Sequence, residues 1–304
     1  MLTEHISDEE HNMSKLLKQI AVGSAVFGLA TVVGTTVSQA DGKDTKNLKT
    51  IKVGINSPSK TDDGVWKRVK ANGKKNGIDI KLVTFTDFNQ PNQALQDGQI
   101  DANAFQHYAF LKDWNQHHHA DLQAVGQTVS GPGRLYSDKH KSIKDIPDGG
   151  TIAIANDPTN EARALFLLQS AGLIKLKSGV ENPTAKDVVS SPKHLKIKEL
   201  AADQTLASLK SVDAAVISAT FVEAAGRNPE SAIYVWNVDN KHTHQYINII
   251  ASSKAKENKW YTKALVKSYQ ADNVANYINK TSHGTEVPAW KGAPQPKLKT
   301  AEQK

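Results

Sequence analysis

The sequence predicts an α/β protein of two lobes, each with a mostly parallel sheet covered by helices on both faces. From residue 51 onward, short apolar runs typical of strands alternate with segments of helical periodicity. Two such stretches follow one another and are separated near Gly131-Pro132-Gly133. The length of 304 residues is enough for one large or two modest domains. In such a protein a ligand is expected between the lobes, at the carboxyl ends of strands.

Residues 1–40 are predicted to be a signal peptide or an N-terminal anchor. Residues 20–33 (IAVGSAVFGLATVV) form an apolar run that is too short for a membrane span but typical of a signal-peptide core. Lys15 and Lys18 precede this run, and the small residues of VSQA favour cleavage after Ala40. Either alternative places the body of the protein outside the cytoplasm, as an extracytoplasmic protein.

Composition excludes several classes of function. The chain has no cysteine, so it has no disulfide, no thiol catalyst, no thiolate metal site and no lipobox cysteine for acylation. Its net charge is +7, and residues 41–304 carry 36 basic against 27 acidic residues. These charges are spread along the chain without a basic stripe and interleaved aromatics, so we expect no nucleic-acid partner. Dispersed positive charge suits the neighbourhood of an anionic cell envelope.

The first alternating stretch follows a polar linker at residues 41–50. Residues 51–55 (IKVGI) alternate apolar and polar side chains, as a half-buried strand does. Thr61 or Asp62 is placed to cap an amphipathic helix that ends near residues 73–77. The further elements predicted here are a strand at 78–85, a short helix at 91–97, an extended piece at 100–105, a helix from Tyr108 and a strand at 122–129.

The second stretch, from residue 134 to about residue 240, repeats the alternation. A strand at 151–155 is followed by a polar turn and a helix at 162–171, which Gly172 ends. A third stretch begins after it, and residues 291–304 are predicted to be a flexible basic tail. The remaining predicted elements are strands at 195–200, 214–217, 233–236 and 246–251, and helices at 205–211, 221–225 and 258–279.

Residues 151–163 (TIAIANDPTNEAR) have the arrangement of a small-anion site. A strand that ends at a capped helix directs free backbone N–H groups to one point. Arg163 adds a planar guanidinium group, which pairs well with a carboxylate. No catalytic nucleophile stands in this segment, so it indicates that the chain grips an anion rather than reacting with it.

Several segments together resemble the NlpA-type lipoproteins, the methionine-binding components of bacterial ABC importers. The segments follow the family's order over about residues 50–290, which makes the resemblance more specific than any single motif. They are IKVGINSP (51–58), FTDFNQPNQALQDGQIDANAFQHYAFL (85–111), LQAVGQT (122–128), SIKDIPDGGTIAIANDPTNEARALFLLQSAGLIKL (142–176), LKIKEL (195–200), VDAAVIS (212–218) and YINIIA (246–251).

The resemblance implies a type II periplasmic-binding-protein fold, with two lobes, a hinge and an interlobe ligand cleft. Lobe one is expected to hold residues 51–133 and 242–290, and lobe two residues 134–241. Two hinge crossings would let the lobes close over a ligand.

The resemblance also implies a ligand site. Phe88, Phe105 and His107 are expected to form the wall that lobe one contributes. Arg163 is expected to hold the carboxylate of the ligand, and Asn248 to hydrogen-bond its amino-acid end. The chemistry agrees with this assignment, because aromatic rings suit a thioether through sulfur–ring contacts.

The chain departs from the family's pattern in three places. The lipid-anchoring cysteine is missing. Ser218 and Thr220, which are also expected to contact the ligand, stand where the family usually has an asparagine-containing segment. The family's Pro-Met-Gly-Leu-Tyr-Ser appears here as GPGRLYS (131–137), and the added Arg134 is expected to reshape the pocket.

The function implied by the resemblance is that of a solute receptor, not an enzyme. It would capture an amino acid, expected to be methionine, by lobe closure and deliver it to a membrane permease that a cytoplasmic ATPase drives. We expect a monomer without a cofactor. The chain has no G-x-S-x-G and no H-E-x-x-H segment, which also argues against a hydrolase.

Two histidine clusters leave an alternative open, a metal-binding receptor or metalloprotein. They are His117-His118-His119 and His242-Thr243-His244, and neutral imidazoles are good metal ligands. Three consecutive histidines on a helix point in different directions, however, and no Asp/Glu–His pair is placed to complete a tetrahedral set. We therefore expect solvated surface at these positions and no metal site.

Overall fold

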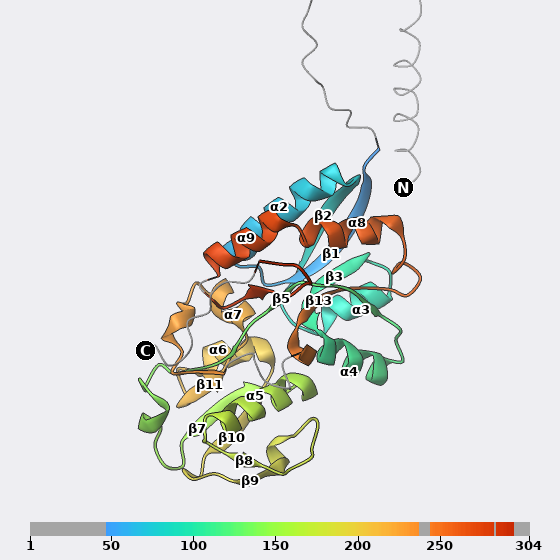
Figure 1. The fold of residues 1–304 in the computed structure, drawn as a ribbon. Helices are drawn as coiled ribbons and strands as arrows, with labels where there is room; N and C mark the ends of the chain where they lie inside the picture. Colours follow the sequence, from blue (N-terminus) through green and yellow to red (C-terminus); the bar gives the residue numbers. More distant parts are fainter. Residues whose placement is uncertain (1–46, 237–243, 283, 295–304) are drawn as a thin grey trace, which may run out of the picture. The chain divides into compact units, whose positions relative to one another are not determined.

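Two five-stranded sheets form the framework of the protein (Figure 1). The computed structural model describes residues 47–236, 244–282 and 284–294, which all lie in one unit of the chain, residues 45–304. The strand order is β2-β1-β3-β13-β4 in the first sheet and β10-β7-β11-β6-β12 in the second. The first sheet consists of β1 (Lys49–Asn56), β2 (Ile78–Phe85), β3 (Ala102–His107), β4 (Gln123–Gln127) and β13 (Asn248–Ser252). The second consists of β6 (Gly133–Tyr136), β7 (Thr151–Ala155), β10 (Lys196–Leu200), β11 (Ala214–Val216) and β12 (Tyr234–Trp236).

Helices cover the sheets, and short pairs of strands complete the fold. The helices near the first sheet are α2 (Lys60–Lys75), α3 (Gln90–Gln96), α4 (Tyr108–His118), α8 (Trp260–Tyr269) and α9 (Asp272–Thr281). Those near the second are α5 (Pro158–Ser170), α6 (Thr205–Ser208) and α7 (Ala219–Ala224). The small pairs are β5 (Val129–Ser130) with β14 (Val287–Pro288), and β8 (Lys175–Leu176) with β9 (Val188–Ser190). Short 3-10 turns are η1 (Ile143–Asp145), η2 (Ala185–Asp187), η3 (Ala202–Gln204), η4 (Pro229–Ser231) and η5 (His244–Tyr246).

Each sheet is parallel except for one reversed strand. In the first sheet β13 is antiparallel to both of its neighbours, β3 and β4. In the second sheet β6 is antiparallel to both β11 and β12. Each reversed strand is the first one that the chain adds after it leaves the other sheet. The prediction of two mostly parallel sheets is therefore confirmed, and the reversed strands mark where the chain crosses.

Alternating side chains of the first sheet fill two separate cores, because successive residues of a strand point to opposite faces. Ile250 of β13 packs in the core that α2, α8 and α9 cover. Its neighbours Ile249 and Ala251 pack on the opposite face, with Leu95 of α3 and Trp114 of α4. Figure 1 shows α2, α8 and α9 side by side, and α2 contacts both of the other helices. Buried side chains therefore pack on both faces of this sheet.

The second sheet follows the same rule. Ile152 and Ile154 of β7 pack in the core under α5, which contributes Leu165 and Leu168. Ala153, between them, faces the opposite core of α6 and α7. Both faces of β7 are therefore covered. The carboxyl end of the strand is the part that remains for contact with a ligand.

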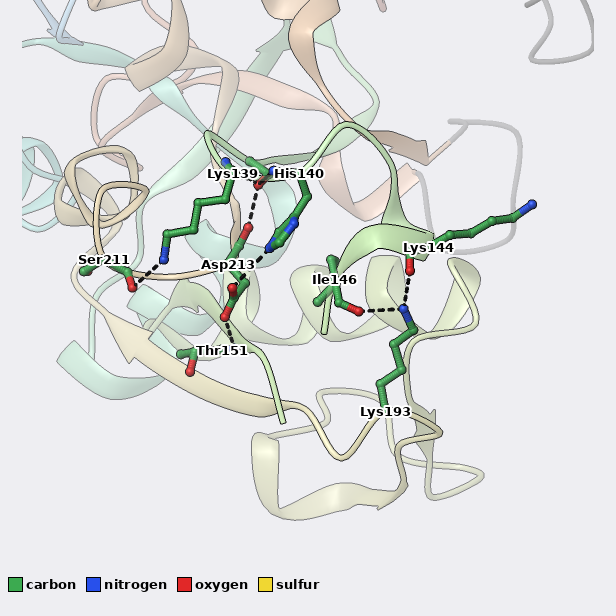
Figure 2. Close-up of polar contacts among 9 residues, drawn as sticks. Lys139, His140, Lys144, Ile146, Thr151, Lys193, Ser211 and Asp213 are labelled. Atoms are coloured by element: carbon green, nitrogen blue, oxygen red, sulfur yellow. Dashed lines mark hydrogen bonds and ion pairs between the residues drawn. The ribbon is translucent and has the colours of Figure 1, made fainter. Parts of the chain in front are cut away.

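Polar contacts fasten the other end of the second sheet (Figure 2). One carboxylate oxygen of Asp213 accepts the backbone N–H of Thr151 at 2.8 Å, and the other lies 3.1 Å from Nε2 of His140. The Nζ atom of Lys193 donates to the carbonyl oxygens of Ile146 and Lys144, each at 2.6 Å. These contacts join loops at the amino ends of β7 and β11, so this end is a structural anchor and the opposite end is open to function.

Three helix predictions need correction. The helix predicted at 258–279 is two helices, because Ala271 has an extended backbone that separates α8 from α9. A continuous helix of that length would run for about 33 Å, longer than the roughly 24 Å of α2, and the break lets both segments pack on it. The cap of α2 is Ser59, which accepts the N–H of Asp62 in a capping box, and neither Thr61 nor Asp62 is the cap. Helix α5 begins at Pro158 and not at residue 162, because Asp157 caps it and proline suits its first position.

Several predictions concern the ends of the chain. The predicted linker at 41–50 runs too far, since β1 already begins at Lys49. The signal peptide or anchor at 1–40 lies outside the described residues, as do residues 295–304 of the predicted tail. Within the described ranges, none of the helices combines the length and the apolar character that crossing a membrane requires.

Candidate functional site

A pocket lies between the two lobes, at the carboxyl ends of strands from both sheets. Strand β3 contributes its last residues, and Ala155 at the end of β7 and Val216 at the end of β11 face the same pocket. We call it the interlobe pocket. All seven residues predicted to contact a ligand line it: Phe88, Phe105, His107, Arg163, Ser218, Thr220 and Asn248. The structure therefore brings the whole predicted set together, and ligand contact by each remains a prediction.

An aromatic cluster forms one side of the interlobe pocket. The ring centroid of Phe88 lies 6.0 Å from that of Phe105 and 6.2 Å from that of Phe110. It also lies 5.1 Å from the ring of Phe221, which belongs to α7 of the other lobe. Rings at these separations attract one another and offer polarizable surface to a thioether. The cluster is therefore both a pocket wall and a contact between the lobes.

His107 has two roles, because it is buried at the junction of β3 and α4. Its Nδ1 atom accepts the backbone N–H of Phe110 at 3.1 Å and so caps α4. A neutral ring with an accepting Nδ1 carries its proton on Nε2. That Nε2 therefore donates to the Oδ1 atom of Asn160 in lobe two, at 3.2 Å. Burial, with the positive charge of Arg163 as a second cause, lowers the pKa of His107 to about 3.

Arg163 extends from α5 into the interlobe pocket. Its Nη2 atom donates to the carbonyl oxygen of Gly131 at 2.8 Å, and its guanidinium carbon lies 5.0 Å from the ring centroid of Tyr246. Its Nε atom is buried and has no acceptor among the described residues. Burial lowers the pKa of Arg163, but an arginine this basic stays charged at any physiological pH. The pocket thus holds a permanent cation with an unused donor.

The remaining predicted residues stand on elements that meet the pocket from both lobes. Asn248 is the first residue of β13 and is the register partner of His107 on β3. Ser218 precedes α7, and its hydroxyl does not cap that helix. Thr220 lies in the first turn of α7. These three polar side chains are free of a helix-capping duty, which leaves them available to a ligand.

Asp157 caps the amino end of α5, where an anion site was predicted. The side chain of Asp157 accepts the backbone N–H of Asn160 at 3.0 Å and also the hydroxyl of Thr159. This carboxylate occupies the N–H of Asn160, one of the groups that were expected to hold an anion, and a negative charge here would repel one. Asp157 is not among the pocket residues, whereas Arg163, two turns along the helix, is.

Phe110, Arg134, Asn160 and Tyr246 are among the pocket residues that were not predicted to contact a ligand. Asn160 stands within the singled-out segment 151–163, but nothing in its spacing separates it from the capping residues around it. Tyr246 stands at the start of the predicted strand 246–251 and reads as a core aromatic there. Arg134 was expected to reshape the pocket as an addition to the family's pattern, but it was not predicted to contact the ligand. The signal that identifies all four is proximity between distant segments, which only the fold supplies.

A second cavity adjoins the interlobe pocket and contains three carboxyl groups, those of Asp62, Glu223 and Glu286. We call it the acidic cavity. Burial is the largest cause that raises the pKa of each group, and repulsion among the three raises it further for Glu223 and Glu286. The pKa of Glu286 is raised well above its ordinary value. Asp62 and Glu223 come from different lobes and both contact the hydroxyl of Ser59.

The described histidines of the two clusters have separate positions. The ring of His118 stacks on Trp114 at 3.6 Å, His117 lies 3.3 Å from the carboxylate of Asp113, and His119 ends α4 in a left-handed conformation. His244 stacks on Tyr108 at 5.6 Å, and His242 lies outside the described residues. Within the described part of the chain, no three histidine, aspartate or glutamate side chains are grouped so that they could hold a metal ion.

Comparison with known proteins gives a consistent result. The model of the NlpA lipoprotein family matches residues 51–290. The chain is 38% identical over 284 residues to the D-methionine-binding lipoprotein MetQ of Escherichia coli O157:H7, a match that covers 91% of this chain and 100% of that protein.

Solved structures agree with the sequence match. The substrate-binding protein of a methionine transporter from Streptococcus pneumoniae is similar with a TM-score of 0.75 at 42% identity, over 79% of this chain and 96% of that one. A nutrient-binding protein from Burkholderia cenocepacia, solved bound to methionine, is similar with a TM-score of 0.74 at 39% identity, over 79% of this chain and 100% of that one. The predicted type II periplasmic-binding-protein fold is confirmed by this likeness and by the two sheets with their reversed strands. The chain belongs to the NlpA lipoprotein family.

Proposed function

We propose that this protein is the extracytoplasmic substrate-binding protein of an ABC importer and that it captures an amino acid, methionine, between its two lobes. It delivers this ligand to a membrane permease that a cytoplasmic ATPase drives, and it does no chemistry itself. The family membership supports this proposal, as do the relatives that are named for methionine binding and methionine transport.

The observation that carries the proposal is the guanidinium group of Arg163 in the interlobe pocket. A buried cation with an unpaired donor is stabilised by an anion, and the α-carboxylate of an amino acid supplies two acceptor oxygens. The pocket is too enclosed by aromatic rings to suit a strongly hydrated ion. A zwitterionic amino acid with an apolar side chain suits both the guanidinium group of Arg163 and the aromatic cluster.

Each of the other predicted residues has a proposed contact. Phe88 and Phe105 pack against the thioether, and Asn248 hydrogen-bonds the amino-acid end of the ligand. Neutral His107 is a hydrogen-bond partner and not a second cation, because its pKa of about 3 keeps it uncharged. Ser218 and Thr220 offer hydroxyl groups from lobe two.

Lobe closure is the proposed motion, with lobe one at residues 51–133 and 242–290 and lobe two at 134–241. The membership of the strands in the two sheets supports this division. The hinge then lies beside the reversed strands β6 and β13, where the chain crosses. Contacts across the pocket, such as that between His107 and Asn160, form when the lobes meet.

The proposed location is the outer face of the cell membrane or the space beyond it, with residues 1–40 as the signal peptide or anchor. The relatives are called lipoproteins, but this chain has no cysteine to acylate, so its attachment must differ from theirs. Mass spectrometry of the protein recovered from cells identifies a cleaved or a retained segment. A lipid-modified residue would contradict this part of the proposal.

The proposal is tested by calorimetry of the purified protein with L-methionine, D-methionine and other amino acids, with and without a metal chelator. We expect saturable binding of methionine in a one-to-one complex that the chelator does not affect. Binding of divalent metals without any response to amino acids would overturn the proposal and favour the metal-binding alternative.

A further inference from the structure

Arg134 is a second arginine in the interlobe pocket, and its side chain is only partly used. The residue lies on β6 and is 8% exposed. Its Nη2 atom donates to the carbonyl oxygen of Gly284 at 3.1 Å. Its Nε and Nη1 atoms are buried and have no acceptor among the described residues. A buried guanidinium with two unpaired donors is unfavourable unless something else accepts from them.

Arg134 and Arg163 have different surroundings within the pocket. Arg163 is next to Tyr246 and His107, and these are the groups coupled to its charge. The charge of Arg134 is coupled instead to Tyr136, Glu223 and Glu230. The hydrogen bonds separate the two guanidinium groups as well, since Arg163 donates to the carbonyl oxygen of Gly131 and Arg134 to that of Gly284. One carboxylate on Arg163 therefore leaves the donors of Arg134 unpaired.

We propose that Arg134 determines specificity by donating to a neutral oxygen at the far end of the ligand's side chain. The ligand class that fits is an amino acid with such an oxygen, namely the sulfoxide of oxidised methionine or the side-chain amide of glutamine. This inference rests on the proposed function, because it takes Arg163 as the partner of the α-carboxylate.

The electrostatic surroundings favour a neutral acceptor over a second carboxylate. Glu223 and Glu230 already offset the positive charge of Arg134 from a distance, although neither is within ion-pairing range of it in the described structure. Glu286 lines the same pocket, and burial and neighbouring carboxyl groups already raise its pKa, so a second ligand carboxylate would add to that repulsion. What Arg134 lacks is an acceptor for its N–H groups, and a sulfoxide or amide oxygen supplies that without adding charge.

The test compares the affinities of the wild type and Arg134→Met for L-methionine, L-methionine sulfoxide, L-glutamine and L-glutamate by calorimetry. We expect the wild type to bind at least one of the two neutral oxygen-bearing ligands. The substitution should weaken that binding at least tenfold more than it weakens methionine binding. The two neutral ligands distinguish a sulfoxide site from an amide site.

Arg68→Met is the matched control, because Arg68 stacks on Tyr277 at 3.7 Å and is not among the pocket residues. Near-UV circular dichroism checks the fold of each variant. If Arg134→Met does not fold, Arg134→Lys replaces it, because lysine keeps the positive charge but lacks the planar guanidinium group. Equal losses of affinity for methionine and for the oxygen-bearing ligand would overturn the proposal. A wild type that binds neither neutral ligand would also overturn it. So would a glutamate affinity that the Arg134 substitution lowers as much as it lowers that of the neutral ligand. Failure of every amino acid to bind would instead overturn the proposed function itself.

Discussion

The interlobe pocket and the acidic cavity lie side by side and carry opposite charges. The pocket holds the guanidinium groups of Arg163 and Arg134, and the cavity holds the carboxyl groups of Asp62 and Glu223. Glu286 lines both of them. The arginines form no ion pair with these carboxylates in the described structure. The buried charge of each region must therefore be compensated within that region.

The two regions do so in different ways. An arginine is too basic to give up its proton, so a buried arginine needs an acceptor, and here the ligand is the proposed one. A carboxyl group titrates readily, so burial and mutual repulsion in the acidic cavity are relieved when it takes up a proton. The comparison teaches that burial of an ionisable group creates a demand for a ligand in one region and for a proton in the other.

The same contrast gives the regions opposite dependences on pH. The pKa of His107 is lowered by burial, so its contribution to folding stability is complete above about pH 6.5 and is lost as the pH falls toward 3. The pKa of Glu286 is raised, so its contribution is complete below its ordinary value and is lost as the pH rises through the raised one. Lowering the pH therefore reduces the contribution of His107 to folding stability and increases that of Glu286.

The largest expected effect comes from removing the cation of the pocket. Arg163→Met should weaken methionine binding by about a hundredfold or more, because truncating one partner of a buried charge pair costs roughly 2–5 kcal/mol. Calorimetry with L-methionine measures the loss, and circular dichroism checks that the fold is kept.

Arg227→Met is its matched control, since Arg227 pairs with Asp138 at 2.6 Å and does not line the pocket. The control should bind methionine as the wild type does. An Arg163→Met protein that is folded and retains full affinity would contradict the role proposed for this guanidinium.

A smaller effect is expected from neutralising the acidic cavity. Glu286→Gln keeps the shape of the side chain and removes its titration, so the melting temperature of the variant should exceed that of the wild type more at pH 8 than at pH 5. The gain at pH 8 should be a few degrees, because about 1 kcal/mol shifts the melting temperature of a protein of this size by about 2–4 °C. Thermal denaturation followed by circular dichroism across this pH range makes the measurement.

Glu181→Gln controls for the change of net charge, because the Glu181 side chain is 75% exposed. It should leave the pH profile unchanged. A Glu286→Gln profile that runs parallel to that of the wild type would show that the acidic cavity does not store a proton.

The smallest expected effect concerns the specificity of the pocket. Ser218→Asn restores the amide that is usual in the family, and it should raise methionine affinity by up to about tenfold, since one hydrogen bond contributes about 0.5–1.5 kcal/mol. Calorimetry measures the change, and the pH profile of stability should stay as in the wild type because the acidic cavity is untouched. A loss of affinity would show that the hydroxyl of Ser218 is the better partner here.

Local patterns predicted the strands with the clearest apolar runs and the boundaries set by strong turn residues. Strands β2 and β7 begin and end where the pattern places them, at 78–85 and 151–155. The helix predicted at 258–279 was wrong because its periodicity continues through Ala271, whose extended backbone separates α8 from α9. Strand β6 was not predicted, because its four residues include glycine and arginine and lack an apolar alternation.

The candidate site shows the same division. The seven predicted residues came together because a family resemblance carries long-range information that no local pattern holds. The anion site expected at the start of α5 stays a prediction, because Asp157 caps this helix and sequence spacing does not tell whether a capping carboxylate excludes an anion. The unpaired donors of Arg134 and the acidic cavity became visible only where distant segments meet.

The sequence by itself determined the class of the fold, the alternation of strands and helices, the net positive charge and the absence of cysteine chemistry. These properties depend on residue type and on spacing along the chain. Only the tertiary structure decided which donors remain unpaired and which carboxyl groups crowd together. Burial and hydrogen-bond partnership depend on neighbours far apart in the sequence, and for Arg134 and Glu286 those neighbours are what set the chemistry.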